Sequence, residues 1–402
     1  MKILVLNAGS SSLKYQLIQT DDGAVLLKGL CERIGIDGGH IEHKVNGQKI
    51  EYNLQMANHT EALNKVLSLL VDKKVGAISS LKEIEAVGHR VLHGAEEFKE
   101  SVLIEGDVLA KLKDLIPLGP LHQPANIDGI EACQKLMPGV PQVAVFDTAF
   151  HSTMPAKAYR YAIPTEDYTR HHIRKYGFHG TSHKFVSERL AEIMGYKGRF
   201  IVLHIGNGAS ISAVNSGICQ DTSMGYTPLD GCQMGTRSGS VDASILPVLC
   251  KKHNMTVDEA INYLNKKSGS LGISGLSDNR DIEKRALDLS DKSAVAEACR
   301  LANDMRTYQD KKIVGGYVFA MGGVDAIAFT AGLGENSPVY REQVLSGLAG
   351  LGIKLDDNRN RVNFKRGEEQ LISSDDSAVK VYVIPTNEEL QIAKETVEVL
   401  SK

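Results

Sequence analysis

The sequence has little of what marks a disulfide-rich, membrane-spanning or secreted protein. Its six cysteines form no C-x-x-C pair and follow no regular spacing, so we expect reduced thiols in a cytoplasmic protein. The longest uncharged segment, residues 200–220, is interrupted by Gly, Asn and Ser, which excludes it as a membrane span. The first apolar run, residues 3–6, is too short for the core of a signal peptide.

A strong charge of either sign is also absent. With 46 Lys and Arg against 49 Asp and Glu, the formal net charge is −3, so no overall basic field would attract a polyanion. We therefore expect neither nucleic acid nor a membrane surface as a partner, while local sites for small anions remain open. A hydrophobic share of 42% and a charged share of 24% are typical of globular proteins, and 402 residues suffice for two or three domains.

Three common site motifs are missing. The sequence contains no G-x-x-x-x-G-K-[ST], no G-x-G-x-x-G and no G-x-S-x-G segment. These absences exclude a P-loop, a Rossmann dinucleotide site and a hydrolase nucleophile elbow in their usual forms. A nucleotide site, if present, must therefore use another fold.

A repeated pattern is present instead. Residues 2–18 form an apolar run, a small polar turn and an alternating run, which predicts a β-hairpin. Residues 200–214 repeat it, with Val202 and Gly206 standing 197 positions after Val5 and Gly9. Two similar halves are the leading interpretation, and a chance likeness between short apolar runs that end in Gly is the alternative.

Other elements follow from periodicity and caps. Apolar spacing predicts helices over 60–74 and 182–194, and a strand over 326–330 that leads into a Gly-rich turn. After a strand over 379–384, Asn387 is predicted to cap a final helix that has two acids in its first turn. No low-complexity linker separates the halves, so a boundary near residue 150 must be tight.

Three Gly-rich turns, at Gly9, Gly206 and Gly332, each follow a strand-like run. Backbone N–H groups can approach an anion closely at such turns because Gly has no Cβ, and phosphate is the natural guest. Each turn taken singly is better interpreted as an ordinary hairpin. Three in one chain favour phosphate binding.

Charged and imidazole side chains stand in unusual surroundings. Arg90 lies within an apolar run and Arg237 among small residues, where each guanidinium suits a carboxylate or phosphate; a structural salt bridge is the alternative. His179 and His183 have the spacing of two zinc ligands on a helix, but no third ligand has matching spacing. Asp147 ends a strand-like run, where it could orient a substrate, hold a metal through water or cap the next turn.

Residues 7–14 and 179–183 closely resemble the two signature segments of the acetate kinase family. The resemblance continues in the same order over essentially the whole chain, through residues 88–90, 146–150, 204–208, 234–239, 329–332 and 384–389. It implies the duplicated α/β fold shared with sugar kinases, Hsp70 and actin, with an active-site cleft between two domains. The implied domains are residues 1–150 plus the C-terminal helix 386–402, and a nucleotide-binding domain over 151–385.

The resemblance also implies an activity, the reversible transfer of the γ-phosphoryl group of ATP to acetate, which gives acetyl phosphate and ADP. It implies Mg²⁺, for which Mn²⁺ can substitute, and a homodimer. The residues that match metal-site positions are Asn7 and Glu388. Those that match catalytic and substrate positions are Arg90, Leu92, His122, Asp147, His179 and Arg237. Those that match nucleotide contacts are Lys14, His204, Ile205, Gly206, Asn207, Gly208, Asp278, Asn279, Arg280, Gly332, Leu333, Gly334, Glu335 and Asn336.

The family role of Asp147 is a proton acceptor or an orienting group. Acetate at pH 7 has no proton to give up and is already a competent nucleophile, so we interpret Asp147 as an orienting group. His179 is expected to stabilise the transition state, and the two arginines to bind the carboxylate and the phosphoryl group. Leu92 is expected to line the pocket for the methyl group of acetate.

The chain departs from the usual family pattern at Ala95, Gly119, Gln123, Ser240 and Ala243. None of these is a residue assigned to chemistry, but the missing acid at Ser240 and the change at Gln123 could alter the pocket rim or loop closure. Two other functions remain open. One is a kinase for propionate or another short-chain acid on the same scaffold, and the other is a nucleotide-dependent binding module without transfer chemistry.

Overall fold

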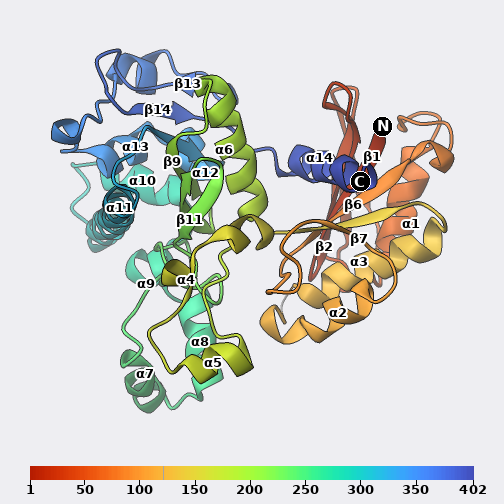
Figure 1. Ribbon diagram of the computed structural model, residues 1–402, viewed down its shortest axis with the longest axis horizontal. Coiled ribbons are helices and arrows are strands. Elements are labelled where there is room, and N and C mark those ends of the chain that lie inside the picture. The colour runs from red at the N-terminus through yellow and green to blue at the C-terminus, as the bar shows by residue number, and fades with distance from the viewer. Residues whose placement is uncertain (121) are drawn as a thin grey trace. The chain divides into compact units, whose positions relative to one another are not determined.

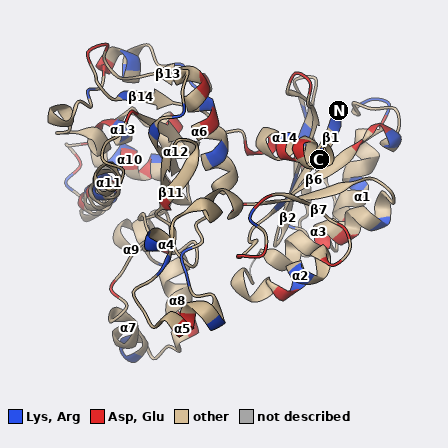
Figure 2. Ribbon diagram, in the orientation of Figure 1, with Lys and Arg blue, Asp and Glu red and all other residues tan. Residues whose placement is uncertain are grey.

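The computed structural model describes residues 1–120 and 122–402 and divides into two compact units (Figure 1). Unit 1 is Met1–Ser152 with Asn387–Lys402, and unit 2 is Thr153–Thr386. The sequence-based boundaries were placed at residues 150 and 386. Basic and acidic residues are interspersed along both units, as the nearly neutral composition leads one to expect (Figure 2).

Unit 1 is built on an eight-stranded sheet in the order β5-β4-β3-β2-β1-β6-β8-β7. Strands β1 to β5 form an antiparallel meander, β1, β6 and β8 run parallel, and β7 pairs antiparallel with β8. The strands are β1 (Lys2–Gly9), β2 (Ser12–Gln19), β3 (Ala24–Glu32), β4 (His40–Val45), β5 (Gln48–Asn53), β6 (Ala86–Val91), β7 (Val102–Leu103) and β8 (Gln142–Phe146).

Helices cover both faces of this sheet, which explains why β1 is a continuous apolar run. Because side chains alternate along a strand, Leu4 and Leu6 share one core with α1 and α3, and Ile3 and Val5 share another with Ile392 of α14. The unit 1 helices are α1 (His59–Leu70), η1 (Leu81–Glu83), α2 (Val108–Asp114), η2 (Ile116–Leu118), α3 (Gln123–Leu136) and α14 (Glu388–Leu400), and η3 (Ala149–Thr153) ends at the unit boundary.

Unit 2 contains a six-stranded sheet in the order β11-β10-β9-β12-β14-β13. Strands β9 to β11 form an antiparallel meander, β9, β12 and β14 run parallel, and β13 pairs antiparallel with β14. The strands are β9 (Arg199–Ile205), β10 (Ala209–Asn215), β11 (Ile218–Thr222), β12 (Ala326–Thr330), β13 (Gln370–Leu371) and β14 (Lys380–Val383).

Helix α6 packs against β9 and β12, and the long helix α11 contacts α9, α10 and α13. The helices of unit 2 are α4 (Ala156–Tyr159), α5 (Thr165–His171), α6 (Gly180–Met194), α7 (Ile245–His253), α8 (Val257–Lys266), α9 (Gly269–Ser274), α10 (Asn279–Leu287), α11 (Ala294–Ala320), α12 (Ala331–Asn336), α13 (Pro338–Leu345), η4 (Ala349–Leu351) and η5 (Asn358–Val362).

The two units share one topology, which confirms the prediction of two similar halves. The order β3-β2-β1-β6-β8 in unit 1 corresponds strand by strand to β11-β10-β9-β12-β14 in unit 2, with the same parallel and antiparallel pairings. Val5 of β1 and Val202 of β9 are the residues that the sequence repeat aligned. The repeat therefore marks a duplicated α/β fold rather than a chance likeness.

Most predicted elements are confirmed, and two needed correction. The first helix ends at Leu70 rather than near residue 74, because the Asp72 carboxylate accepts hydrogen bonds from the backbone N–H groups of Lys74 and Val75 and so favours a turn. The predicted Gly-rich turn after β12 is the short helix α12. The Asn387 cap is confirmed, since its Oδ1 accepts from the backbone N–H of Leu390 at 3.0 Å.

The six cysteines are all present as thiols, as expected. Within residues 1–120 and 122–402, no helix combines the length and apolar character needed to cross a bilayer.

Candidate active site

Asn7 and Lys14 are neighbours across the first hairpin. They are direct register partners on β1 and β2, so their side chains project from the same face of the sheet. The hairpin turns at Gly9, where a Cβ would lie 2.8 Å from the Ser12 hydroxyl. His59 of α1 holds the turn, because its Nε2 lies 2.7 Å from the Gly9 carbonyl oxygen. The turn that the sequence singled out is therefore fixed from α1 and presents a polar and a basic side chain.

Arg90 and Asp147 meet at the carboxyl ends of two adjacent parallel strands, β6 and β8. The Asp147 carboxylate is buried and accepts from both Nε and Nη2 of Arg90, while Nη1 lies 3.5 Å from Oδ1 of Asn7. The ion pair that we considered as the alternative for Arg90 is thus present. Burial alone would lower the pKa of Arg90, but the carboxylates of Asp147 and Glu388 raise it overall.

Glu388 belongs to the same group of side chains. It opens α14, and burial raises the pKa of its carboxyl group to about 7, with a further increase from the negative charge of Asp147. Two neighbouring carboxyl groups create a place where a cation would be stabilised.

Hard oxygen donors of this kind fit Mg²⁺, which is commonly held by one or two carboxylates together with water and substrate phosphate. Asn7 contributes an amide oxygen near Arg90 in this same unit. In the part of the chain that the structure describes, no group of three or more His, Cys, Asp or Glu residues could hold a metal by itself. The donor set therefore fits a metal that is completed by water and substrate rather than an all-protein cage.

Leu92 follows β6 and is buried, 6% exposed. Its backbone N–H donates to Oδ1 of Asn126 on α3, and its Cδ2 would lie 2.8 Å from a Cβ on Gly119, so the Gly at that position makes room for it. The Gln123 side chain forms two hydrogen bonds with the His93 backbone. It accepts from the N–H at 3.3 Å and donates to the carbonyl at 3.1 Å. Gln123, where the chain departs from the family pattern, therefore links α3 to the residues around Leu92 that follow β6. His122, just before α3, is exposed.

In unit 2, His179 stands at the N-terminus of α6 in a left-handed conformation with φ of 58°. Non-Gly residues rarely adopt this conformation, and such strain is typical of functional sites. The His179 ring stacks on His204 of β9 with centroids 4.3 Å apart. A Cβ on Gly208 would lie 3.4 Å from Nε2 of His179 and 3.6 Å from Nη1 of Arg237. An imidazole and a guanidinium thus converge on the open space beside Gly208.

Arg237 is half-buried without an acidic partner among the described residues. Its Nη1 donates to the Pro228 carbonyl at 3.2 Å and lies 3.6 Å from the Met234 sulfur. Burial lowers the pKa of its guanidinium because no carboxylate compensates for the lost hydration. A buried cation of this kind is suited to an anionic ligand.

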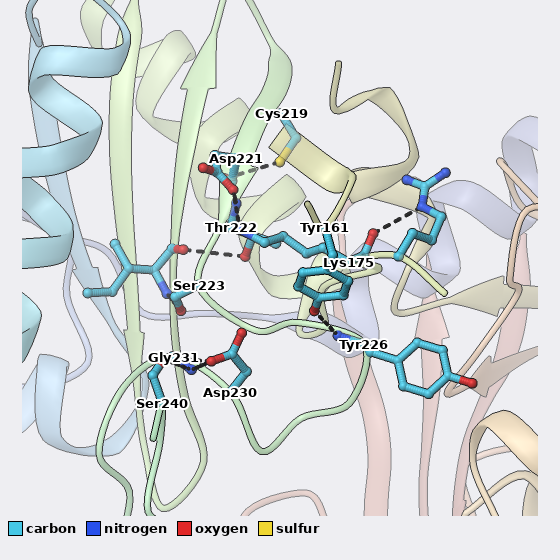
Figure 3. A network of polar contacts seen from close by, with 12 residues as sticks. Tyr161, Lys175, Cys219, Asp221, Thr222, Ser223, Tyr226, Asp230, Gly231 and Ser240 are labelled. Atoms are coloured by element: carbon cyan, nitrogen blue, oxygen red, sulfur yellow. Dashed lines mark hydrogen bonds and ion pairs between the residues drawn. The ribbon is translucent and has the colours of Figure 1, made fainter. Parts of the chain in front are cut away.

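Hydrogen bonds fasten the base of the loop that carries Arg237 (Figure 3). The Ser240 hydroxyl donates to the Asp230 carboxylate at 2.6 Å and accepts from the Gly231 N–H at 3.0 Å, while the Ser240 N–H donates to the Gly231 carbonyl. An acid at position 240 would instead face Asp230 with a second negative charge. Ser240 therefore suits this chain's own loop, whereas Ala243 is simply exposed.

A cavity of about 770 Å³ lies beside the second and third Gly-rich turns. Of the residues predicted to contact nucleotide, those that line this cavity are Gly206, Asn207, Asp278, Asn279, Arg280, Gly332, Leu333 and Asn336. Predictions that lie outside the lining are Lys14, His204, Ile205, Gly208, Gly334 and Glu335. Of these, Glu335 has a clear structural contact, because its carboxylate accepts from the backbone N–H groups of Ala331 and Thr386.

Sequence reasoning missed the outer lining of the cavity, which is made by Ser277, Glu283, Lys284, Leu287, Ser337 and Arg366. Helical spacing from Asn279 to Glu283 and Leu287 on α10 was a usable signal, because residues four apart share a helix face. Asn279 itself donates to the Gly206 carbonyl, and its Oδ1 is buried without a partner among the described residues. Asn279 thus links α10 to the Gly-rich turn beside the cavity.

A sequence model of the acetokinase family matches residues 2–394. The chain belongs to the acetokinase family. It is 56% identical to an acetate kinase of Caldanaerobacter subterraneus subsp. tengcongensis, over 98% of each chain. An acetate kinase of Thermoanaerobacterium thermosaccharolyticum is 55% identical over 100% of this chain and 99% of its own.

Solved structures are also similar to the chain over almost its full length. The crystal structure of Porphyromonas gingivalis acetate kinase has a TM-score of 0.93 at 46% identity, and covers 99% of both chains. A propionate kinase from Francisella tularensis has a TM-score of 0.91 at 43% identity, also over 99% of both chains. The family and the fold are therefore those that the sequence motifs indicated.

Proposed function

We propose that this protein is an acetate kinase, which transfers the γ-phosphoryl group of ATP to the carboxylate of acetate, directly and reversibly, to give acetyl phosphate and ADP. Relatives that carry this name match the chain over its full length at 53–56% identity. The observation that carries the proposal is Arg237, a half-buried guanidinium without an acidic partner among the described residues, beside Nε2 of His179. This arrangement provides a site for a second anion, which a nucleotide-dependent binding module does not require.

The chemistry needs charge neutralisation more than a base. Acetate is already a nucleophile, and the obstacle is the approach of one anion to another. In the proposed mechanism Arg237 and His179 donate hydrogen bonds to the phosphoryl oxygens, where charge spreads in the transition state. Arg90 binds the acetate carboxylate, and Asp147 fixes the Arg90 guanidinium through two hydrogen bonds. Asp147 thus acts as an orienting group and not as a proton acceptor.

The remaining roles are also proposals. Leu92 and His122 border the acetate, and the 770 Å³ cavity takes the nucleotide with its phosphates toward Gly206 and Gly332. Asn7 and Glu388 hold Mg²⁺, or Mn²⁺ in its place, and Lys14 contacts a phosphate. The metal, when bound, neutralises charge on the phosphate oxygens.

Arg237 gives the test. Arg237→Gln removes the charge, and we expect acetate-dependent kcat to fall on the order of 10²–10³-fold, the usual loss for one transition-state donor. Arg237→Lys keeps the charge without the planar fork and should retain more activity. Arg199, which pairs with Asp325 at the start of β9, provides the matched control, since Arg199→Gln should leave kcat unchanged. Wild-type kcat in Arg237→Gln would contradict the proposal.

Propionate is the second candidate substrate, because a propionate kinase is among the similar structures. Buried Leu92 favours the smaller acid, and an extra methylene is worth only about 1–3 kcal/mol in such pockets. We therefore expect kcat/KM to decrease from acetate to propionate to butyrate. A higher kcat/KM for propionate would assign the protein to propionate instead.

We also propose a homodimer in the cytoplasm. Helix α11 exposes Leu301, Met305 and Tyr308 at helical spacing, with Phe319 82% exposed on the same helix. A contiguous apolar stripe of this kind suits a contact with a second copy of the chain. Light scattering of the wild type should give twice the mass of 43.7 kDa, and Tyr308→Glu should give the single mass. A wild type of single mass would refute the dimer.

The cytoplasmic location is supported by the six cysteines, which are present as thiols, as is usual in a reducing compartment.

A further inference from the structure

A line of hydrogen bonds leads from His179 into the core of unit 2. His179 and His183 lie one turn apart at the start of α6, while Ser210 and Ser212 alternate on β10 and so share a face. The Ser210 hydroxyl lies 2.9 Å from Nδ1 of His179 and 2.7 Å from Nε2 of His183. The Ser212 hydroxyl lies 2.8 Å from Nδ1 of His183. His183, Ser210 and Ser212 are fully buried.

One proton on Ser210 couples the two imidazoles. A serine hydroxyl that lies between two ring nitrogens donates to one and accepts from the other. If His183 carries its proton on Nε2, that N–H donates to Ser210, and Ser210 donates to Nδ1 of His179. A neutral His179 must then carry its proton on Nε2. In this arrangement the Ser212 hydroxyl would donate to Nδ1 of His183, which then carries no proton.

The other nitrogen of His179 faces the place where chemistry is proposed. Nε2 lies beside the Cβ position of Gly208, next to Arg237. An N–H at this point attracts a phosphoryl oxygen, whereas a bare lone pair would repel it. The stacked His204 ring, with planes 18° apart, also restricts rotation of the His179 ring. The tautomer of His179 therefore decides whether it can assist transfer.

We propose that His183, acting through Ser210, is a positioning residue that keeps the proton of His179 on Nε2, directed toward the transferred phosphoryl group. This inference rests on the proposed function and adds a residue pair that acts without touching substrate. Nothing covalent changes in the pair. Its contribution is to hold one tautomer and one ring orientation before the substrate arrives.

The test combines kinetics with a direct observation of the tautomer. Ser210→Ala removes the coupling hydroxyl, and His183→Gln retains a side-chain N–H that can donate to Ser210. We expect Ser210→Ala to lower kcat by on the order of 10–100-fold with KM for ATP and acetate within twofold, since misorientation affects the reacting complex more than binding. His183→Gln should retain more activity than His183→Leu.

Histidine-selective ¹⁵N labelling gives a readout that a merely structural role would not change. In the wild type we expect an acceptor-type shift for Nδ1 of His179 and a protonated-type shift for Nε2, with the signals assigned through His179→Gln. In Ser210→Ala the two shifts should move toward each other as the tautomers mix. His43→Gln is the matched control, because His43 is equally buried but bonds to Tyr15 and Val75 in unit 1.

The outcomes separate the two claims. An unchanged ¹⁵N pattern or wild-type kcat in Ser210→Ala overturns the positioning role, even if acetate-dependent turnover is confirmed. Absence of turnover in the wild type overturns the proposed function, while the ¹⁵N pattern still reports on the coupling. If His183→Gln fails to fold, Ser210→Ala decides alone, because loss of one hydroxyl leaves the imidazole in place.

Discussion

Gly208→Ala should strongly slow phosphoryl transfer without disturbing the fold. The added methyl carbon would lie 3.4 Å from Nε2 and 3.5 Å from Cε1 of His179, and 3.6 Å from Nη1 of Arg237. These are ordinary van der Waals distances, and the backbone at Gly208 is outside the left-handed region, so Ala fits locally. The methyl group would nevertheless fill the space between two donors that must lie about 2.7–3.1 Å from a transition-state oxygen.

The expected loss follows from that displacement. Losing one preorganised donor costs about 2.7–4 kcal/mol, which corresponds to 10²–10³-fold in kcat. Initial rates of ADP formation at saturating ATP and acetate measure it, and urea unfolding measures the stability of the variant. Gly315→Ala on α11 is the control, because its new methyl meets nothing within 4 Å. A Gly208→Ala protein within threefold of wild-type kcat would refute the placement of the reacting phosphoryl group.

Three further predictions concern stability, substrate size and loop support. Burial lowers the pKa of His89 from 6.5 to about 4, so the stability it contributes is complete above pH 6.5 and is lost as the pH falls toward 4. Between pH 7 and pH 5 the free energy of unfolding should fall by about 2 kcal/mol because of this group. The variant His89→Gln keeps a donor toward Gln142, and urea titrations should show that its free energy of unfolding falls less than that of the wild type over the same pH range. Leu92→Ala should raise the ratio of the kcat/KM for propionate to that for acetate by about 10-fold. An unchanged ratio would show that Leu92 does not line the pocket for the acid. Ser240→Asp should place a second carboxylate against Asp230 and lower kcat, whereas Ser240→Asn should not; equal rates for both would show that the loop base does not position Arg237.

Much of the fold could be predicted because its signals are local. The hairpins, the strand over 326–330 and the Asn387 cap each depend on residues that are close together in sequence. The repeat at an offset of 197 residues indicated the shared topology of the two units. The predicted end of α1 was wrong because a single side chain, that of Asp72, accepts hydrogen bonds from backbone N–H groups beyond Leu70. Periodicity does not report such competition.

The candidate site was harder, since it depends on contacts between distant residues. The pairing of Arg90 with Asp147 arises because β6 and β8 are parallel neighbours, which the sequence around either residue does not reveal. His204 is predicted to contact nucleotide, and the stacking of its ring on His179 became visible only in the structure. The tie from Gln123 to His93 likewise became visible only in the structure.

The most direct test of the central claim is a matched count of two products. Purified protein with ATP, Mg²⁺ and hydroxylamine is assayed with and without acetate, so that any acetyl phosphate is trapped as acetyl hydroxamate while ADP is measured in parallel. The proposed function predicts ADP release that depends on acetate, with one hydroxamate formed for each ADP. ADP release that is unaffected by acetate, or that yields no hydroxamate, would contradict it.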